Sequence, residues 1–275
     1  MSKSPPTKAP RILEFTLDLP TDPNTAWRLL SDPTALASWF APTVEGSGQP
    51  GTAMTLGWGP DIRWRTVVAA ADPGRLVRWE DELAAYGALP PTDGKVIVEW
   101  QLSPGPEGTR LRLVHSGFGD GADWDDMLDG TRAGWTFYLW HLLETVRHHL
   151  GHTRTVVYER RSSTLSREAL GARLFGSTGL ALEPNPPRAG STARLQLGGA
   201  AWTFQVEHAR LPTHLFGKLA ELGGALLLVE MEPGRTGPLQ TGLWLSTWGL
   251  DAGALDRLRS GVKTMADAVF GPPAG

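Results

Sequence analysis

The sequence contains no cysteine among its 275 residues. Disulfide bonds, thiolate metal sites and cysteine nucleophiles are therefore excluded. The first ten residues, MSKSPPTKAP, lack the apolar run of a signal peptide. No stretch approaches the roughly 20 apolar residues that a membrane-spanning helix requires. Together these absences predict a soluble protein of the reducing cytoplasm with no membrane span.

Strongly basic segments are also missing. The formal net charge is −3, and neither half of the chain has the basic face expected of a nucleic-acid binder. A glycine-rich phosphate loop between a strand and a helix is absent, and so is the Gly-X-Ser-X-Gly nucleophile elbow. The sequence therefore predicts no nucleic-acid partner and no cofactor.

Tryptophan, by contrast, is abundant. The chain has 12 tryptophans, while hydrophobic residues make up 41% and charged residues 20%. Large aromatic side chains each bury much apolar area. This composition is typical of a globular chain that has enough aromatic bulk for two cores or for the wall of a wide cavity.

The first half of the chain predicts one strand, two short helices, a meander and a long helix. Residues 12–19 alternate in polarity, which indicates a strand, and short helices are expected at 24–30 and from 33 to about 39. Five further strands joined by tight turns are typical of an antiparallel meander; they are expected at 52–58, 62–68, 76–82, 96–102 and 110–115. An apolar stripe from Trp135 to Leu150 indicates an amphipathic helix that Gly151 ends.

The same order of elements recurs in the second half. Three pairs of landmarks lie 138 or 139 residues apart: Gly51 and Gly190, Leu76 and Leu215, Trp64 and Trp202. We therefore expect a duplicated domain, with a disordered tail at 1–10, a first domain at 11–151 and a second, degenerate copy at 152–275. The second half lacks a counterpart of Trp39-Phe40 and of the Gly134-Trp135 pair. It could instead serve to cover apolar surface of the first.

Five segments of the first half carry a resemblance to a known family: TAWRLLSDP (25–33), LASWF (36–40), ADPGRLVRW (71–79), GTRLRLVHSGF (108–118) and Gly134-Trp135. In this order they resemble the SRPBCC superfamily, which is also called START-like or helix-grip. Within it they are similar to homologues of the activator of the ninety-kilodalton heat-shock protein's ATPase.

This resemblance implies an α+β fold of two tandem helix-grip (START-like) domains, each a curved antiparallel sheet wrapped on a long C-terminal helix. A strongly bent sheet cannot close fully on one helix, so a cavity is expected between them. The residues predicted to line it in the first copy are Trp39, Phe40, Trp58, Trp64, Trp79, Trp100, His115, Phe118, Trp135 and Leu139.

Polar residues offer weaker signals. His115 lies in register with Leu111 and Leu113 and should point inward, as a ligand contact or an acid–base group. The acidic run at 80–82 indicates a solvated strand end, and the alternative is a carboxylate at the mouth of the pocket. The aspartates of 120–129 indicate a solvated loop before the long helix, capped by Asp129 or Thr131. His148 and His152 have metal-ligand spacing, but they lie at a helix end, where cationic histidine is favourable in any case. We predict no metal site and no catalytic set.

Three functions remain open at this stage. The favoured one is non-enzymatic binding of a hydrophobic or amphipathic small molecule in the first cavity. The second is a co-chaperone-like interaction module with a chaperone protein as its partner, which the resemblance implies. The third is a cyclase- or hydrolase-like enzyme that uses His115, for which no nucleophile, base and orienting residue can be assembled.

Overall fold

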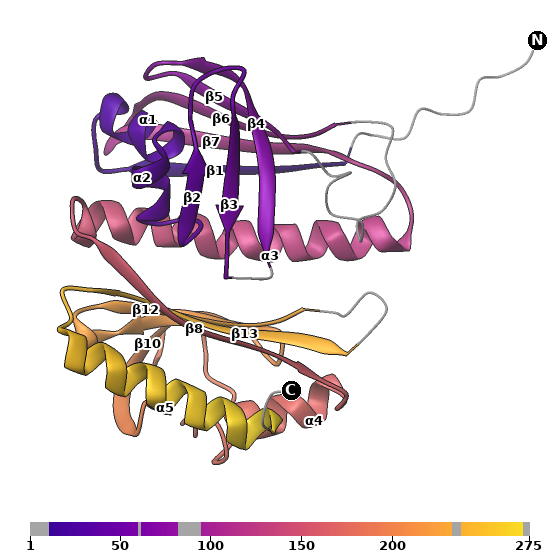
Figure 1. Ribbon diagram of the computed structural model, residues 1–275, viewed down its shortest axis with the longest axis vertical. Coiled ribbons are helices and arrows are strands. Elements are labelled where there is room, and N and C mark those ends of the chain that lie inside the picture. Colours follow the sequence, from indigo (N-terminus) through magenta and orange to yellow (C-terminus); the bar gives the residue numbers. More distant parts are fainter. Residues whose placement is uncertain (1–10, 60–61, 82–94, 233–237, 272–275) are drawn as a thin grey trace, which may run out of the picture. The chain divides into compact units, whose positions relative to one another are not determined.

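The computed structural model describes residues 11–59, 62–81, 95–232 and 238–271. The chain divides into two compact units with the boundary between Leu150 and Gly151 (Figure 1). The tail expected at residues 1–10 lies outside the described residues.

The first unit is a seven-stranded antiparallel sheet with the order β1-β7-β6-β5-β4-β3-β2. Its strands are β1 (Arg11–Leu19), β2 (Thr43–Gly46), β3 (Ala53–Gly57), β4 (Arg63–Asp72), β5 (Leu76–Asp81), β6 (Val96–Gly105) and β7 (Gly108–Phe118). Its helices are α1 (Pro23–Ser31), α2 (Pro33–Ala37) and α3 (Ala122–Glu144), and α3 continues into a short π-helical turn, Thr145–His149. Figure 1 shows α3 running across one face of this sheet.

Local sequence explains how the two short helices begin. Asp22 accepts hydrogen bonds from the backbone N–H groups of Asn24 and Thr25 and caps α1, while Asp32 accepts from the N–H of Ala35 and caps α2. Each cap precedes a proline, whose fixed φ suits the first helical position. These two helices lie between β1 and β2 in the chain and end just before Trp39 and Phe40.

In the first unit one strand was not predicted and one expectation is wrong. Strand β2 was not predicted, because Thr43–Gly46 is only four residues long and mostly exposed, so it has no apolar alternation to detect. Helix α3 begins at Ala122, so the acidic segment is helix rather than a solvated loop capped by Asp129 or Thr131. Asp123 and Asp125 lie in its first turn, where carboxylates interact favourably with the helix dipole.

The second unit is a six-stranded antiparallel sheet with the order β8-β13-β12-β11-β10-β9. Its strands are β8 (Arg154–Ser163), β9 (Thr192–Leu197), β10 (Ala200–Arg210), β11 (His214–Leu219), β12 (Ala225–Glu232) and β13 (Leu239–Trp248). Its helices are α4 (Arg167–Phe175), the short 3-10 turn η3 (Ala220–Leu222) and α5 (Ala252–Phe270), which lies along one face of this sheet in Figure 1.

The two sheets have the same topology. Strand for strand, β1-β7-β6-β5-β4-β3 corresponds to β8-β13-β12-β11-β10-β9, and only β2 has no counterpart. Fine structure repeats as well. Gly51 and Gly190 both have positive φ, and their N–H groups donate over 2.8 Å to Val68 and Val206 respectively. Both long strands are irregular directly after that valine.

The fold is therefore α+β with two tandem sheet-and-helix domains, each ending in a long helix, as predicted. A local bulge at the same point of both copies is independent of the apolar alternation that builds any sheet. The repeat of that detail supports duplication of one ancestral domain. Among the described residues, no helix is both long and apolar enough to cross a bilayer.

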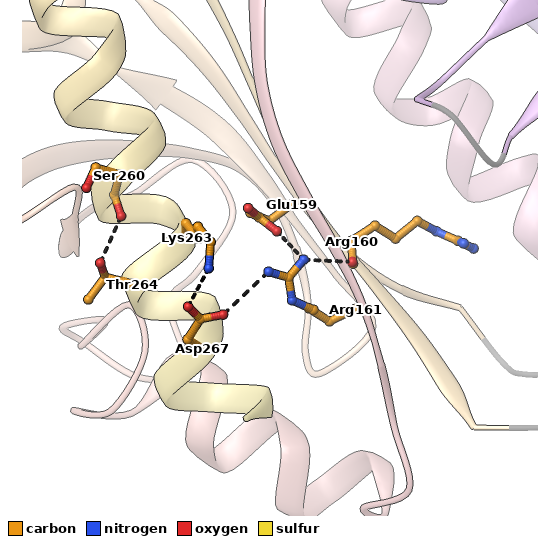
Figure 2. A network of polar contacts seen from close by, with 7 residues as sticks. All are labelled: Glu159, Arg160, Arg161, Ser260, Lys263, Thr264 and Asp267. Atoms are coloured by element: carbon orange, nitrogen blue, oxygen red, sulfur yellow. Dashed lines mark hydrogen bonds and ion pairs between the residues drawn. The ribbon is translucent and has the colours of Figure 1, made fainter. Parts of the chain in front are cut away.

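In the second unit a charged network joins β8 to α5 (Figure 2). Arg161 contacts Glu159 on its own strand and reaches Asp267 on α5 over 3.5 Å, while Lys263 donates to Asp267 over 2.7 Å. Arg161 is only 16% exposed. In the first unit, the corresponding strand β1 instead packs Leu13, Phe15 and Leu17 against the core.

Candidate functional site

The first unit contains a hollow of about 270 Å³ between the inner face of its sheet and α3. Strands β3 to β7 supply one wall, α3 supplies the other, and Phe40 enters from the segment after α2. The residues that line the hollow are Phe40, Leu56, Trp58, Trp64, Trp79, Asp81, Val98, His115, Gly130, Thr131, Gly134, Trp135 and Tyr138. We call this space the aromatic cavity.

Phe40 is the centre of the cavity's ring system. Its ring stacks on Trp135 with centroids 5.3 Å apart and planes only 9° from parallel. It meets Trp58 and Tyr138 edge to face at 5.2 and 4.8 Å. Such aromatic pairs contribute about 0.5–1.5 kcal/mol each beyond simple burial. The wall is therefore held by ring contacts from three separate parts of the chain.

Trp100 and Trp39 lie behind this wall, in the core. Both side chains are fully buried. Trp100 meets Trp135 edge to face at 5.2 Å and Trp79 at 5.4 Å. Trp39 donates its indole N–H over 2.8 Å to the carbonyl oxygen of Leu29 in α1. These two indoles pack against rings of the cavity wall without lining the hollow themselves.

His115 is joined to α3 by a hydrogen bond that fixes its protonation. The Nε1–H of Trp135 donates to Nδ1 of His115 over 2.9 Å. An indole nitrogen can only donate, so Nδ1 must be the unprotonated nitrogen and the ring proton must lie on Nε2. Burial lowers the pKa of His115 from 6.5 to about 3. At neutral pH this histidine is therefore a neutral ring with a fixed Nε2–H tautomer.

Three N–H groups on the cavity lining lack an acceptor among the described residues. They are Nε2 of His115, Nε1 of Trp58 and Nε1 of Trp79. A buried donor that is left unsatisfied costs about 1–3 kcal/mol. The wall of the aromatic cavity therefore carries donors that the described part of the chain does not satisfy.

Among the described residues that line the cavity, Asp81 is the one acidic side chain. It follows Trp79 on the inward face of β5 and interacts with the side chains of Thr66 and Trp64. Burial raises the pKa of this carboxyl from 3.8 to about 6. The sequence prediction of a solvated acidic strand end is therefore wrong for Asp81. Its alternation with Val77 and Trp79 was the signal that could have placed it.

Two glycines form part of the cavity wall that α3 supplies. Gly130 and Gly134 are four residues apart, so they lie on one face of the helix. A β-carbon at either position would meet no described atom within 4 Å. The second unit differs, because a β-carbon at Gly261 of α5 would lie 2.1 Å from the α-carbon of Gly198. There the helix touches the β9–β10 turn, whereas α3 stands away from its sheet.

A hollow beside α5 in the second unit is lined differently from the aromatic cavity. Its volume is about 530 Å³, but no aromatic side chain lines it. Glycines and polar residues make up most of its wall, including Gly198, Gly199 and Arg257. The space between sheet and helix holds a core that includes Phe204 and Val262, both fully buried.

The structure brings together six of the ten residues expected to line the cavity: Phe40, Trp58, Trp64, Trp79, His115 and Trp135. The other four, Trp39, Trp100, Phe118 and Leu139, are buried in the adjoining core. Sequence reasoning did not include Tyr138, favoured a solvated position for Asp81, and missed the glycine face of α3 because it began the long helix at Trp135. Among the described residues, no three His, Asp or Glu side chains are grouped as metal ligands.

A curved antiparallel sheet that holds a hollow against a long C-terminal helix defines the helix-grip class. Residues 20–147 match the model of the family described as "Activator of Hsp90 ATPase homolog 1-like protein". The N-terminal unit is therefore an AHSA1-like domain of the SRPBCC superfamily. Among curated proteins, none matches the chain.

Several solved structures are similar to this chain. Protein MLL2253 from Mesorhizobium loti is 23% identical over 50% of this chain and 98% of its own, with a TM-score of 0.44. The Aha1 dimer from Colwellia psychrerythraea is 17% identical over 51% of this chain and 99% of its own, with a TM-score of 0.45. DynU16, a protein of the dynemicin biosynthetic locus, is 17% identical over 94% of this chain and 96% of its own, with a TM-score of 0.43.

Proposed function

We propose that the N-terminal unit binds a hydrophobic or amphipathic small molecule in the aromatic cavity. The observation that carries this proposal is an unfilled space of about 270 Å³ walled by five aromatic side chains and Phe40. Burial of apolar surface contributes about 25 cal/mol per Å² before ordering costs are subtracted. The volume is just below the roughly 300–1,000 Å³ of typical ligand pockets, which favours a small ligand.

The glycine face of α3 supports the same proposal. Glycine in a helix interior costs about 0.5–1 kcal/mol relative to alanine. At Gly130 and Gly134 the described structure shows no close packing that would require the absence of a β-carbon. A larger side chain at either position would occupy part of the cavity. The two glycines therefore keep the cavity open to a ligand.

Filling the cavity tests the proposal. The full chain is titrated with N-phenyl-1-naphthylamine, an apolar dye whose emission rises in dry surroundings. We expect saturable one-to-one binding that weakens at least tenfold in Gly134→Leu. The matched control is Gly253→Leu, the same change at an exposed position of α5, which should bind as the unmodified chain does. Equal binding by both variants, or no saturable binding at all, would refute the proposal.

A second candidate is a co-chaperone-like interaction module, which the description of the matching family favours. It requires a surface that docks on a chaperone rather than an internal cavity. An ATPase assay with the ninety-kilodalton heat-shock protein tests it. Stimulation that persists in Gly134→Leu would favour this function over ligand binding.

Acid–base catalysis by His115 is less well supported. Its Nδ1 accepts a hydrogen bond from an indole N–H, whereas a carboxylate that orients a catalytic histidine accepts from a protonated Nδ1 and stabilises the charged ring. A base with a pKa of about 3 is far from the value near the working pH that general catalysis needs. The geometry supports a binding role for this ring.

A further inference from the structure

The cavity lining offers hydrogen-bond donors in excess of acceptors. Three of its ring N–H groups, on His115, Trp58 and Trp79, find no acceptor among the described residues. The carboxyl group of Asp81 already interacts with Thr66 and Trp64. A ligand that supplies an acceptor would satisfy a group that the described chain leaves unpaired.

We propose that the ligand is a flat, neutral aromatic ketone or quinone of two or three rings, whose carbonyl oxygen accepts the Nε2–H of His115. This inference rests on the proposed binding function and names its ligand class. Aromatic rings suit the cavity because most of its wall is aromatic: Phe40, Trp58, Trp64, Trp79, Trp135 and Tyr138 all line it. The volume of about 270 Å³ limits the number of rings.

The charges around the cavity favour a neutral acceptor. No lysine or arginine lines the described wall, so a ligand carboxylate would have no counter-ion, and Asp81 would repel it. A carbonyl oxygen needs no proton acceptor in return, whereas a hydroxyl group brings a donor of its own. In a wall rich in donors, a carbonyl group is the better match.

His115 is the strongest of the three donors by its surroundings. The indole of Trp135 donates to the opposite ring nitrogen over 2.9 Å, which polarises the imidazole and strengthens the Nε2–H donor. The same bond holds the ring in one tautomer, so no proton rearrangement precedes binding. Trp135 therefore acts as a positioning residue for this donor.

A matched ligand pair tests the inference. Fluorene and 9-fluorenone have almost the same shape, and differ by a methylene in place of the carbonyl group. Equilibrium dialysis against the full chain measures both dissociation constants. We expect 9-fluorenone to bind about tenfold more tightly than fluorene, the size of one well-formed buried hydrogen bond. In His115→Phe this preference should disappear while fluorene still binds.

The control is His214→Phe on β11. His214 also has a ring nitrogen without a partner among the described residues, and burial likewise lowers its pKa, to about 4. It does not line the aromatic cavity, so this variant should keep the full preference for 9-fluorenone. A loss of preference in His214→Phe equal to that in His115→Phe would overturn the assignment of the donor.

Nitrogen-15 NMR of the unmodified chain gives an independent readout if His115→Phe fails to fold. The Nε2–H signal of His115 should move downfield with 9-fluorenone and stay in place with fluorene. Equal affinity for the two ligands, or an unmoved signal, would overturn the inference and leave cavity binding intact. If neither compound binds and N-phenyl-1-naphthylamine also fails, the proposed function itself is refuted.

Discussion

Trp135 donates its indole N–H to Nδ1 of His115 over 2.9 Å and thereby ties helix α3 to strand β7. The two side chains are buried, at 6% and 5% exposed. One contact thus connects the helix to the sheet, sets the tautomer of the imidazole and forms part of the wall of the aromatic cavity. The indole of Trp135 therefore contributes both to the packing of α3 on the sheet and to the lining of the cavity.

Substitution of Trp135 by phenylalanine removes this donor and keeps an aromatic ring next to Phe40. We expect the free energy of unfolding to fall by about 1–3 kcal/mol, since Nδ1 loses its partner and the smaller ring leaves space. Urea unfolding followed by circular dichroism measures the loss. Trp58→Phe is the comparison, because its indole N–H has no acceptor among the described residues. A larger loss for Trp58→Phe would contradict this account.

Asp81 predicts a pH dependence of stability. Because burial raises its pKa from 3.8 to about 6, the folded chain holds this proton more tightly than the unfolded chain. Its contribution to stability is therefore full below pH 3.8 and is lost as the pH rises through 6. Asp81→Asn should leave stability unchanged near pH 3.5 and raise it by about 1–2 kcal/mol at pH 7, after allowance for partial exposure. A constant difference across this range would show that burial does not control this group.

His115 predicts the opposite pH dependence: its contribution to stability decreases as the pH falls. Its pKa falls from 6.5 to about 3 on folding, so its contribution is full above pH 6.5 and is lost as the pH falls toward 3. In His115→Phe this loss should be absent. The unfolding free energy of the unmodified chain minus that of the variant should therefore decrease steadily as the pH falls from 7 to 4. Parallel curves would refute a buried, neutral imidazole.

The two long helices should respond in opposite ways to the same substitution. Gly134→Ala should stabilise the chain by about 0.5–1 kcal/mol, since the new methyl group meets no described atom within 4 Å. Gly261→Ala should destabilise it by about 1–3 kcal/mol, because the methyl group would lie 2.1 Å from the backbone of Gly198. Thermal unfolding of the two variants checks both signs. The same sign for both would contradict the contrast between an open and a closed helix–sheet space.

The charged network around Arg161 on β8 should contribute more to the free energy of unfolding than the exposed ion pairs of the surface do. Arg161→Met removes the link between Glu159 and Asp267 that Figure 2 shows. We expect a loss of about 1–3 kcal/mol, because Glu159 is only 20% exposed and would lose its partner. Lys263→Met, at a 56% exposed side chain, should cost less than about 0.5 kcal/mol. Equal losses in urea titrations of the two variants would contradict the difference in burial.

Much of the fold could be predicted from alternation and turns. The meander, α1 and α5 follow from apolar periodicity, proline and glycine, which act over a few residues. The start of α3 was missed because four aspartates dominate its first two turns and were interpreted as a loop, although Trp124, Met127 and Leu128 recur among them at helical spacing. Strand β2 was missed because it is short and exposed, and pairing with β3 alone defines it.

The site was harder to predict than the fold. Strand parity places Trp79 and Trp100 on the inward face equally well, yet one lines the cavity and the other lies behind it. That difference depends on how far α3 stands from each strand, which is a tertiary quantity with no local pattern. The donor role of His115 depends likewise on a partner 20 residues away on another element.

Native mass spectrometry of the full chain with and without N-phenyl-1-naphthylamine tests most directly whether the aromatic cavity holds a small molecule. The account predicts a one-to-one adduct on the unmodified chain and on Gly253→Leu, and a strongly reduced adduct on Gly134→Leu. An adduct of equal abundance on all three, or none on the unmodified chain, would contradict it.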